Sequence, residues 1–551
     1  MPDETQMPAR TADAHRSWLI LAAIAAVILA QAVLVFAKSI NWDEFLHFSQ
    51  VYDLPRGRVI WAIQTLHARL FAWARWVPGD VIAQLEAARL GMLVFETVTA
   101  WMIVLSSRLF VDRQIALLAG LAYVAGGYVF LHGFSFRPDP MAAATLLTAL
   151  YLFARRDLSP PNILLTGILI GVAGVMTIKS IFYLPCFAGV AWYRFAERTE
   201  GTRSTLARIA AIPLIAAIAF YGVFTLHRQG IATTQDATAA GVESTAGSYV
   251  LSELFHGLHF TTRQALMAPV ITIGILIIPL TWRRYKRSEK VAIGGLLAPL
   301  ATLIFYRNTF PYYFVFLLAP VCVGISPSIA AMARRYGSMK LMIVVLATPL
   351  ALLAAEPYGV LARQRALIAE VHRLFPRETG YLAYTGFVPD YPRVIPTLIS
   401  GVGLDFYYRQ GKPVIAEAIE RGDVGFVLAD NPIVRAAFAG KVVAHSLQPQ
   451  DFAALHGNFI HYESKLWIAG KMLCPASGEQ AFRTYRPGEH SLQGGSAIID
   501  GRRVAEGSSI ALQPGLHPLD YASGPCLRLW ALHRVPHPLR PFPKGPLTTM
   551  F

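Results

Sequence analysis

The sequence opens with a long apolar run that is followed almost at once by acidic residues. Residues 18–36 read WLILAAIAAVILAQAVLVF, and residues 41–47 read NWDEFLH. An uncharged run of this length approaches the roughly 20 residues that a helix needs to cross a bilayer. It is too long for a secretory signal peptide and lacks a small-residue cleavage site, so we expect an uncleaved membrane span. Asp43 and Glu44 therefore stand close to a predicted membrane surface.

The rest of the chain has the composition of a membrane protein. Of 551 residues, 54% are hydrophobic and 15% are charged, and the mean hydropathy is +0.44. This balance excludes a disordered chain, a secreted mini-domain and a simple cytosolic enzyme. Four cysteines without a Cys-x-x-Cys pair or a His-rich cluster do not indicate a disulfide scaffold or a structural metal site.

Apolar runs predict about eleven membrane-spanning helices, several of them short for a full crossing. The runs lie near residues 18–36, 90–105, 115–131, 141–153, 163–177, 181–195, 209–226, 268–282, 293–305, 312–331 and 341–355. If the N-terminus is cytoplasmic, every cytoplasmic loop is rich in Lys and Arg, as the positive-inside rule requires. The net charge of +15 is then mostly a topology signal, and we expect no nucleic acid as partner.

Three segments lie outside the cytoplasm in this topology. Residues 1–356 form the predicted transmembrane domain, whose first external loop spans 38–86. Apolar residues there recur at helical spacing and predict an amphipathic helix on the membrane surface: Val59, Ile63, Leu66, Leu70, Trp73 and Val77. The second segment, 227–264, is rich in small polar residues and predicts a mobile loop.

The third external segment is the tail, which follows an odd number of spans. Residues 357–470 alternate helical and strand patterns, as in 414–421 and 424–428, and predict an α/β subdomain. Residues 471–551 predict a β-rich, sandwich-like subdomain with turns at Asp500-Gly501 and Pro514-Gly515. Cys474 and Cys526 both lie in this tail, where a disulfide and two free buried thiols are both open.

Candidate functional residues collect on the predicted outer face. Asp43, Glu44 and His47 follow the first span; Arg137 and Asp139 lie in the turn before the fourth. Lys179 stands at the outer end of the fifth span, and 307–313 (RNTFPYY) lies between the ninth and tenth. Helix capping by the acids and snorkelling by single cations are the ordinary interpretations. Several cations facing outward, against the topology bias, favour a site instead.

Such a set of residues suits the transfer of a group from a lipid phosphate. Arg and Lys bind a phosphate and stabilise it as a leaving group. A carboxylate acts as general base toward an acceptor hydroxyl, and an apolar slot between helices holds a polyprenyl chain.

At these residues the sequence resembles the integral-membrane C-type glycosyltransferases (GT-C). The motifs are the Asp43-Glu44 pair after the first span, the Arg137-Pro138-Asp139 turn and the Arg-Asn-x-x-Pro-Tyr-Tyr segment from Arg307. The branch that it is most similar to contains protein mannosyltransferases and the lipid A aminoarabinose transferase. The resemblance covers roughly residues 18–355; the tail matches only in being external.

The resemblance implies a sugar donor linked to polyprenyl phosphate and an acceptor at the membrane exterior. It implies Asp43 as the catalytic carboxylate with Glu44 beside it, and Asp139 as the second acidic position. It implies that Arg137, Lys179 and Arg307 contact the donor phosphate. Further substrate-binding candidates are His47, Arg58, Asn308 and Tyr312. The first loop departs from the Asp-Glu-x-x-Tyr form of the branch, having His47 and Phe48 there. No cofactor is fixed, and a divalent cation (Mg²⁺ or Mn²⁺) held by Asp43 and Asp139 stays open.

The leading hypothesis is an inverting glycosyltransferase of the bacterial inner membrane, with a cytoplasmic N-terminus and a periplasmic or extracellular tail. Its acceptor is lipopolysaccharide or lipid A, another envelope glycan, or protein. The alternative is a transporter or flippase of lipid-linked saccharides, although no internal repeat or paired broken helices support it. A third interpretation makes the tail a binding module anchored by the bundle, but one span would suffice for an anchor.

Overall fold

The computed structural model describes residues 7–155, 157–198, 201–231, 254–395, 401–441, 443, 446–474, 480–521, 524–538 and 545–548. The chain divides into two compact units. The helical unit comprises residues up to Lys38 and Leu54–Pro357; the C-terminal unit comprises Ser39–Asp53 and Tyr358–Met550. The predicted mobile loop falls largely on 232–253, which lie outside the described residues.

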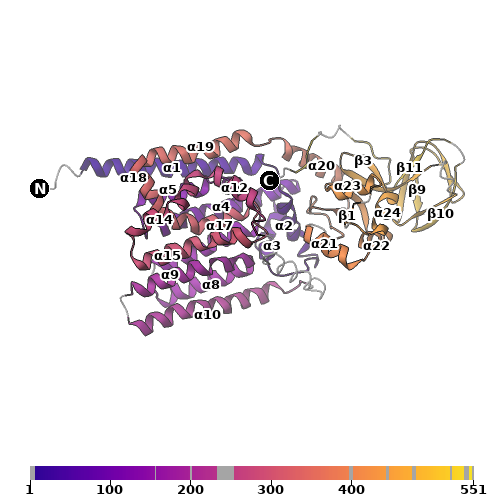
Figure 1. Cartoon of the computed structure of the whole chain (residues 1–551). Helices are drawn as coiled ribbons and strands as arrows, with labels where there is room; N and C mark the ends of the chain where they lie inside the picture. Colours follow the sequence, from indigo (N-terminus) through magenta and orange to yellow (C-terminus); the bar gives the residue numbers. More distant parts are fainter. Residues whose placement is uncertain are drawn as a thin grey trace. The chain divides into compact units, whose positions relative to one another are not determined.

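Helices make up the helical unit (Figure 1). They are α1 (Met7–Ala37), α3 (Leu66–Leu70), η1 (Ala72–Trp76), α4 (Val81–Ser107), α5 (Arg113–Val124), α6 (Tyr128–His132), α7 (Pro138–Arg155), α8 (Pro160–Met176), η2 (Ile178–Tyr183), α9 (Leu184–Ala196), α10 (Thr202–His227), α12 (Leu258–Met267), α13 (Pro269–Leu276), α14 (Ile278–Thr281), η3 (Trp282–Arg284), α15 (Arg287–Leu297), η4 (Ala298–Ala301), α16 (Thr302–Phe305), α17 (Tyr313–Gly324), α18 (Ser326–Tyr336) and α19 (Ser338–Ala355). Those labelled η are 3₁₀-helices.

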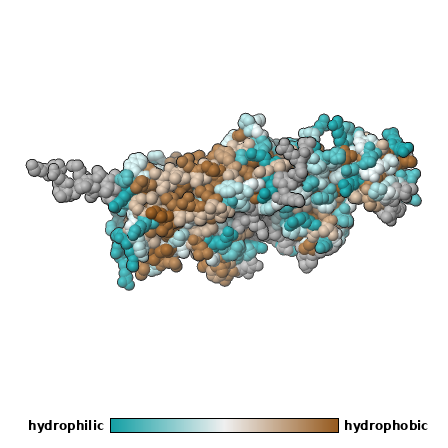
Figure 2. All heavy atoms as spheres, turned by 90° about the horizontal axis from the view of Figure 1, so that it is seen from above, coloured by the Kyte–Doolittle hydropathy of each residue, from teal (hydrophilic) through white to brown (hydrophobic). Residues whose placement is uncertain are grey.

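Each predicted apolar run falls on helical structure, but the count of about eleven full spans is not confirmed. Among the described residues, five helices are long and apolar enough to cross a membrane, and a sixth span arises if the bent pair α17 and α18 counts as one. The two members of that pair meet at 65°. Several other runs are divided into shorter helices. Apolar side chains gather on the surface of the helical unit, as lipid contact requires (Figure 2).

The break between α5 and α6 shows how such a division is stabilised. Gly127 has φ 55°, a left-handed value that favours glycine and ends the helical run. The side chain of Gln264 satisfies the exposed backbone: its Oε1 accepts from the Tyr128 N–H at 2.7 Å, and its Nε2 donates to the Gly126 carbonyl at 3.2 Å. Broken helices are tolerated at membrane depth where such partners exist.

The points where the chain leaves the helical unit lie side by side. Lys38 after α1 forms an ion pair with Glu356 after α19, with Nζ and Oε2 2.9 Å apart. The guanidinium of Arg89, which is fully buried, donates to the Val35 and Lys38 carbonyls at the end of α1. Cations at a helix C-terminus stabilise its unpaired carbonyls. The end of α1 is therefore fixed just before the chain passes into the C-terminal unit.

The first loop does not contain the continuous surface helix predicted over 59–77. Residues 58–62 are not helical, and the short elements α3 and η1 follow. Gln64 has φ 67°, which a right-handed helix cannot accommodate. Arg69, at the end of α3, donates to the His227 and Gln229 carbonyls at the end of α10. This part of the loop is therefore held by hydrogen bonds to α10, and not by the continuous helix that the apolar spacing predicted.

The C-terminal unit combines helices and strands (Figure 1). It contains α2 (Trp42–Asp53), α20 (Val360–Leu374), β1 (Gly380–Ala383), α21 (Gly401–Gln410), α22 (Val414–Glu420), β2 (Val424–Leu428), α23 (Pro432–Phe438), α24 (Pro449–Asn458), β3 (Phe459–Glu463), β4 (Leu466–Leu473), β5 (Ala481–Thr484), β6 (Gly488–Gln493), β7 (Ala497–Ile499), β8 (Arg502–Val504), β9 (Ser509–Leu512), β10 (Gly515–Asp520) and β11 (Leu527–Trp530).

The sheets of this unit join an α/β part to a sandwich-like part. One sheet has the strand order β1-β2-β4-β11-β6-β9, with β3 also paired to β4, and the second has the order β5-β10-β7-β8. β1 and β2 are parallel, with α21 and α22 in the connection between them. Leucines and other apolar residues of both sheets, such as Leu492, Leu512 and Ile499, share one core. Cys474 and Cys526 form a disulfide beside the antiparallel pair β4–β11.

Candidate functional site

The local sequence explains how one end of the helical unit presents charged side chains. Pro138 begins α7 with the fixed φ of a first helical residue, and Asp139 lies in the first turn, where the positive helix end favours a carboxylate. Lys179 lies in η2, whose start is capped by the Thr177 hydroxyl accepting from the Lys179 N–H. Tyr312 directly precedes α17.

These side chains meet in a buried cluster, which we call the cation cluster and define as Arg137, Asp139, Lys179 and Tyr312. Lys179 Nζ lies 2.5 Å from Asp139 Oδ1, and Arg137 Nε lies 3.3 Å from Asp139 Oδ2. All three charged side chains are more than nine-tenths buried. Two cations thus contact one buried carboxylate within this set. Burying three ionised side chains is costly, so the cluster indicates a function more than a contribution to stability.

An aromatic ring completes the cation cluster. The Arg137 guanidinium carbon lies 3.2 Å from the centroid of the Tyr312 ring, and Lys179 Nζ lies 5.5 Å from it. The negative face of the ring attracts both cations and limits the positions that they can take. The neighbouring Tyr313 shares a hydrogen bond of 2.6 Å with the Thr302 hydroxyl, which fixes the start of α17. The Tyr312 ring and Asp139 together fix the positions of both cations.

The other predicted cations of the helical unit are placed differently. Arg307 and Asn308 lie half-buried in the turn between α16 and α17. Tyr306, beside Arg307, packs its ring 5.0 Å from that of Tyr313. We find no ion pair from Arg307 to any residue that the structure describes. Arg58 is exposed on the segment after α2, and within the described ranges no ion pair connects it to the cation cluster.

Asp43, Glu44 and His47 lie on α2 and thus belong to the C-terminal unit. Asn41 caps this helix, because its Oδ1 accepts from the Asp43 N–H at 3.0 Å. In return, Glu44 Oε1 accepts from the Asn41 N–H at 3.1 Å, which completes a reciprocal capping box. The capping interpretation therefore accounts for Glu44. The Asp43 carboxylate takes no part in this box, so the two adjacent acids differ in their contribution to helix capping.

The solved structures that this chain is similar to include two of ArnT from Cupriavidus metallidurans. The one bound to undecaprenyl phosphate matches with a TM-score of 0.55 at 12% identity, over 77% of this chain and 95% of that chain. The apo form matches with a TM-score of 0.52 at 13% identity, over 78% and 95%. The chain has the ArnT fold. The resemblance that the motifs predicted is thereby confirmed at the level of the fold.

Beyond ArnT, an oligosaccharyltransferase of Archaeoglobus fulgidus in complex with zinc and sulfate matches with a TM-score of 0.45 at 13% identity, over 80% of this chain and 72% of that chain. No protein-family model and no curated protein matches the sequence.

Within the ArnT fold of this chain, the residues present do not favour a divalent cation at Asp139. Both oxygens of its carboxylate already contact cationic nitrogens, and a metal ion would have to displace Lys179 and Arg137. Among the described residues no group of three or more His, Cys, Asp and Glu side chains is arranged to hold a metal. We therefore assign no catalytic step to a metal.

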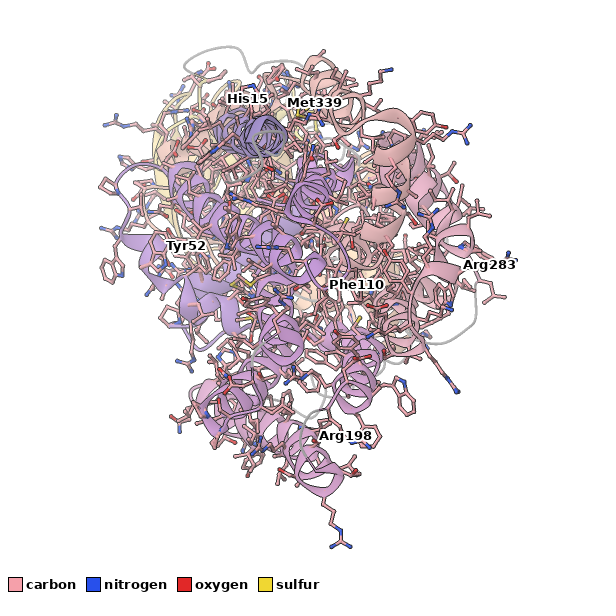
Figure 3. The ribbon with its side chains drawn as sticks, turned by 90° about the vertical axis from the view of Figure 1, so that its left-hand side faces the viewer. His15, Tyr52, Phe110, Arg198, Arg283 and Met339 are labelled. Atoms are coloured by element: carbon pink, nitrogen blue, oxygen red, sulfur yellow. A yellow bond between two sulfur atoms is a disulfide. The ribbon has the colours of Figure 1, made fainter. Side chains whose placement is uncertain are left out.

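Sequence reasoning missed Arg89, although a signal for it exists. Arg89 directly precedes the apolar run 90–105, at the end that the predicted topology places outside the cytoplasm, where Arg137 and Lys179 are also predicted to lie. Its side chain holds the end of α1 and lies 5.7 Å from the Phe134 ring. In this ArnT-like arrangement it supports the segment that leads into Asp43, whereas the basic residues of the opposite helix ends, such as Arg198 and Arg283, lie at the end seen in Figure 3.

Proposed function

We propose that this chain is a glycosyltransferase that moves a sugar from polyprenyl phosphate to an acceptor outside the cytoplasm. The observation that carries the proposal is the buried cation cluster, in which Arg137 and Lys179 converge on the carboxylate of Asp139 within an apolar helical unit. A lipid phosphate combines an anion of the kind that Arg and Lys side chains bind with an apolar tail that suits the exposed apolar surface of the helical unit. In support, ArnT, whose fold the chain has, was crystallised with undecaprenyl phosphate.

In this proposal the two cations act on the leaving group. Lys179 and Arg137 bind the donor phosphate and stabilise the negative charge that it gains when the bond from the anomeric carbon to the phosphate oxygen breaks. Asp139 holds both cations in place through its two oxygens. A carboxylate whose oxygens are both engaged by cations is a poor proton acceptor, so Asp139 is a positioning residue.

Asp43 is then the general base. It takes the proton of the acceptor hydroxyl while the acceptor oxygen forms its bond to the anomeric carbon. One displacement inverts the configuration and leaves polyprenyl phosphate as the second product. We place the enzyme in a bacterial inner membrane with a cytoplasmic N-terminus and the C-terminal unit outside. The acceptor is lipopolysaccharide or lipid A, another envelope glycan, or protein.

The proposal is tested with the purified full-length chain in liposomes that contain undecaprenyl phosphate linked to mannose, glucose or aminoarabinose. An envelope extract serves as acceptor, and released undecaprenyl phosphate is measured by mass spectrometry. We expect release with one of these donors in the absence of any membrane gradient. Movement of the intact donor between leaflets without release would instead identify a flippase.

Asp43→Asn is the variant that tests the base. We expect it to abolish transfer while folding and the binding of undecaprenyl phosphate stay close to those of the wild type, because Asp43 makes neither bond of the capping box with its carboxylate. Its matched control is Asp53→Asn at the other end of the same helix. Full activity of Asp43→Asn would contradict the assignment.

A further inference from the structure

The helix that carries Asp43 is held by residues that lie far away in the sequence. Gln364, on α20, makes a pair of hydrogen bonds to the backbone of Ile40, just before α2. Its Oε1 accepts from the Ile40 N–H at 2.9 Å, and its Nε2 donates to the Ile40 carbonyl at 2.8 Å. The same Nε2 also donates to the Leu547 carbonyl at 2.8 Å. Gln364 is fully buried, so these bonds are not exchanged for bonds to water.

A second set of contacts fixes the first turn of α2. The Phe45 ring stacks on Phe387 with the ring centroids 4.7 Å apart. Phe387 follows Gly386, where a Cβ atom would stand 3.1 Å from the Phe45 carbonyl oxygen. The absence of a side chain at Gly386 therefore lets the two backbones approach closely. This contact comes from the segment that directly follows β1.

A third contact lies one turn further along α2. The Arg393 guanidinium donates to the Ser49 hydroxyl at 3.3 Å, and that hydroxyl donates in turn to the Leu46 carbonyl at 2.8 Å. Contacts before the helix, in its first turn and in its second turn together define its position along its axis and its rotation about that axis. A helix held at one point only could still rotate and move Asp43.

We propose that residues 358–550 act as the frame that positions α2, and that Gln364 is the positioning residue that sets the place of Asp43. Its catalytic consequence rests on the proposed function, whereas the structural part does not. Gln364 is suited to this task because one amide side chain matches both the donor and the acceptor of a single backbone unit. Proton removal is sensitive to such placement, since a shift of about 1 Å can lower a rate roughly 10²-fold.

The experiment compares Gln364→Met with Gln448→Met in the purified full-length chain. Both replace a glutamine of the C-terminal unit by an apolar side chain of similar length. Gln448 donates to the Tyr408 carbonyl at 2.9 Å and contacts the α/β part, away from the α2 contacts described above. Three readouts are taken: amide hydrogen exchange of residues 41–53, binding of undecaprenyl phosphate, and kcat and KM of transfer.

For Gln364→Met we expect faster exchange in residues 41–53, unchanged exchange in residues 497–512, unchanged undecaprenyl phosphate binding, and a kcat lowered roughly 10²-fold with KM little changed. Gln364→Glu, which keeps the acceptor for the Ile40 N–H, should recover part of the kcat. Gln448→Met should leave residues 41–53 and kcat as in the wild type.

Unchanged exchange in residues 41–53 of Gln364→Met would overturn the positioning role. So would faster exchange with an unaltered kcat, because the frame would then not matter for the reaction. If the wild-type chain shows no transfer, the proposed function fails on its own, and the exchange data still decide whether Gln364 positions α2. A general loss of stability would appear equally in residues 497–512 and would count against a specific role.

Discussion

At the scale of single residues, the proposed binding of a lipid phosphate should depend most on the Lys179 side chain. Its ammonium forms the shorter of the two ion pairs to Asp139 and lies near Tyr312 and Tyr313. A hydrogen bond to a charged group contributes about 1.5–3 kcal/mol, so we expect Lys179→Gln to weaken undecaprenyl phosphate binding at least about tenfold. Titration of the purified chain by native mass spectrometry measures this.

The control for Lys179→Gln is Lys286→Gln, the same chemical change at an exposed ion pair with Glu197. Exposed pairs contribute little, and this one lies on a connecting segment before α15. We expect binding and thermal stability to stay unchanged. Equal affinity of the wild type and Lys179→Gln would remove the cation cluster from the donor site.

The same residues show what the sequence could predict of the site. Arg137, Asp139 and Lys179 stood out because charges at predicted membrane ends are costly, and Tyr312 was a candidate through the Arg-Asn-x-x-Pro-Tyr-Tyr segment. The structure brings these four together. The role of Glu44 was left open between capping and chemistry, and only the bond to the Asn41 N–H favours capping. Which oxygen accepts which N–H depends on backbone geometry that residue spacing does not contain.

At the scale of elements, the close approach of α8 and α10 depends on small residues (Figure 1). A Cβ atom at Gly171 would stand 2.5 Å from the Ala216 carbonyl oxygen and 2.7 Å from the Phe220 nitrogen, both in the backbone of α10. Gly167 lies one turn earlier against the same helix, near Ile212 and Ile215. Small residues four apart commonly let two membrane helices pack with their backbones in contact.

We therefore expect Gly171→Ala to separate α8 from α10 and to destabilise the helical unit by about 1–3 kcal/mol or more, since backbone atoms cannot move aside as a side chain can. Thermal unfolding in detergent measures the loss. Gly222→Ala in α10 is the matched control, because a Cβ there meets nothing within 4 Å. If both variants unfold at the wild-type temperature, the contact is looser than the structure indicates.

Local elements were predicted well where periodicity and turn chemistry agree. The predicted helix over 414–421 is α22 (Val414–Glu420), the predicted strand over 424–428 is β2, and the Asp500-Gly501 turn joins β7 to β8. The surface helix over 59–77 was wrong in its continuity, because apolar spacing alone cannot detect the left-handed backbone of Gln64. The predicted span over 115–131 is divided at the α5–α6 break for a similar reason. The break is stabilised by Gln264, which is distant in the sequence.

At the scale of the whole molecule, the disulfide limits how far the sandwich-like part can unfold. Cys474 and Cys526 are 52 residues apart, so the bond removes unfolded-state entropy worth about 4 kcal/mol. We expect the double variant Cys474→Ser/Cys526→Ser to lower the unfolding temperature of the C-terminal unit and to expose residues 480–521 to protease. Treating the wild type with a reductant should reproduce both effects. Cys186 and Cys322 are free thiols, so the reductant acts on the Cys474–Cys526 bond and does not affect them. Resistance of the reduced protein to protease would contradict this expectation.

Because α2 belongs to the C-terminal unit, the contacts that hold it can form only late in synthesis. Ile40 leaves the ribosome 324 residues before Gln364, its hydrogen-bonding partner. At about 5–20 residues per second, that interval is roughly 15–65 s, during which the helix with Asp43 exists without its frame. The bond from Gln364 to Leu547 forms later still. A chain that is cut short before Gln364 by a stalled ribosome or a protease therefore lacks the two hydrogen bonds that hold the backbone of Ile40, just before α2.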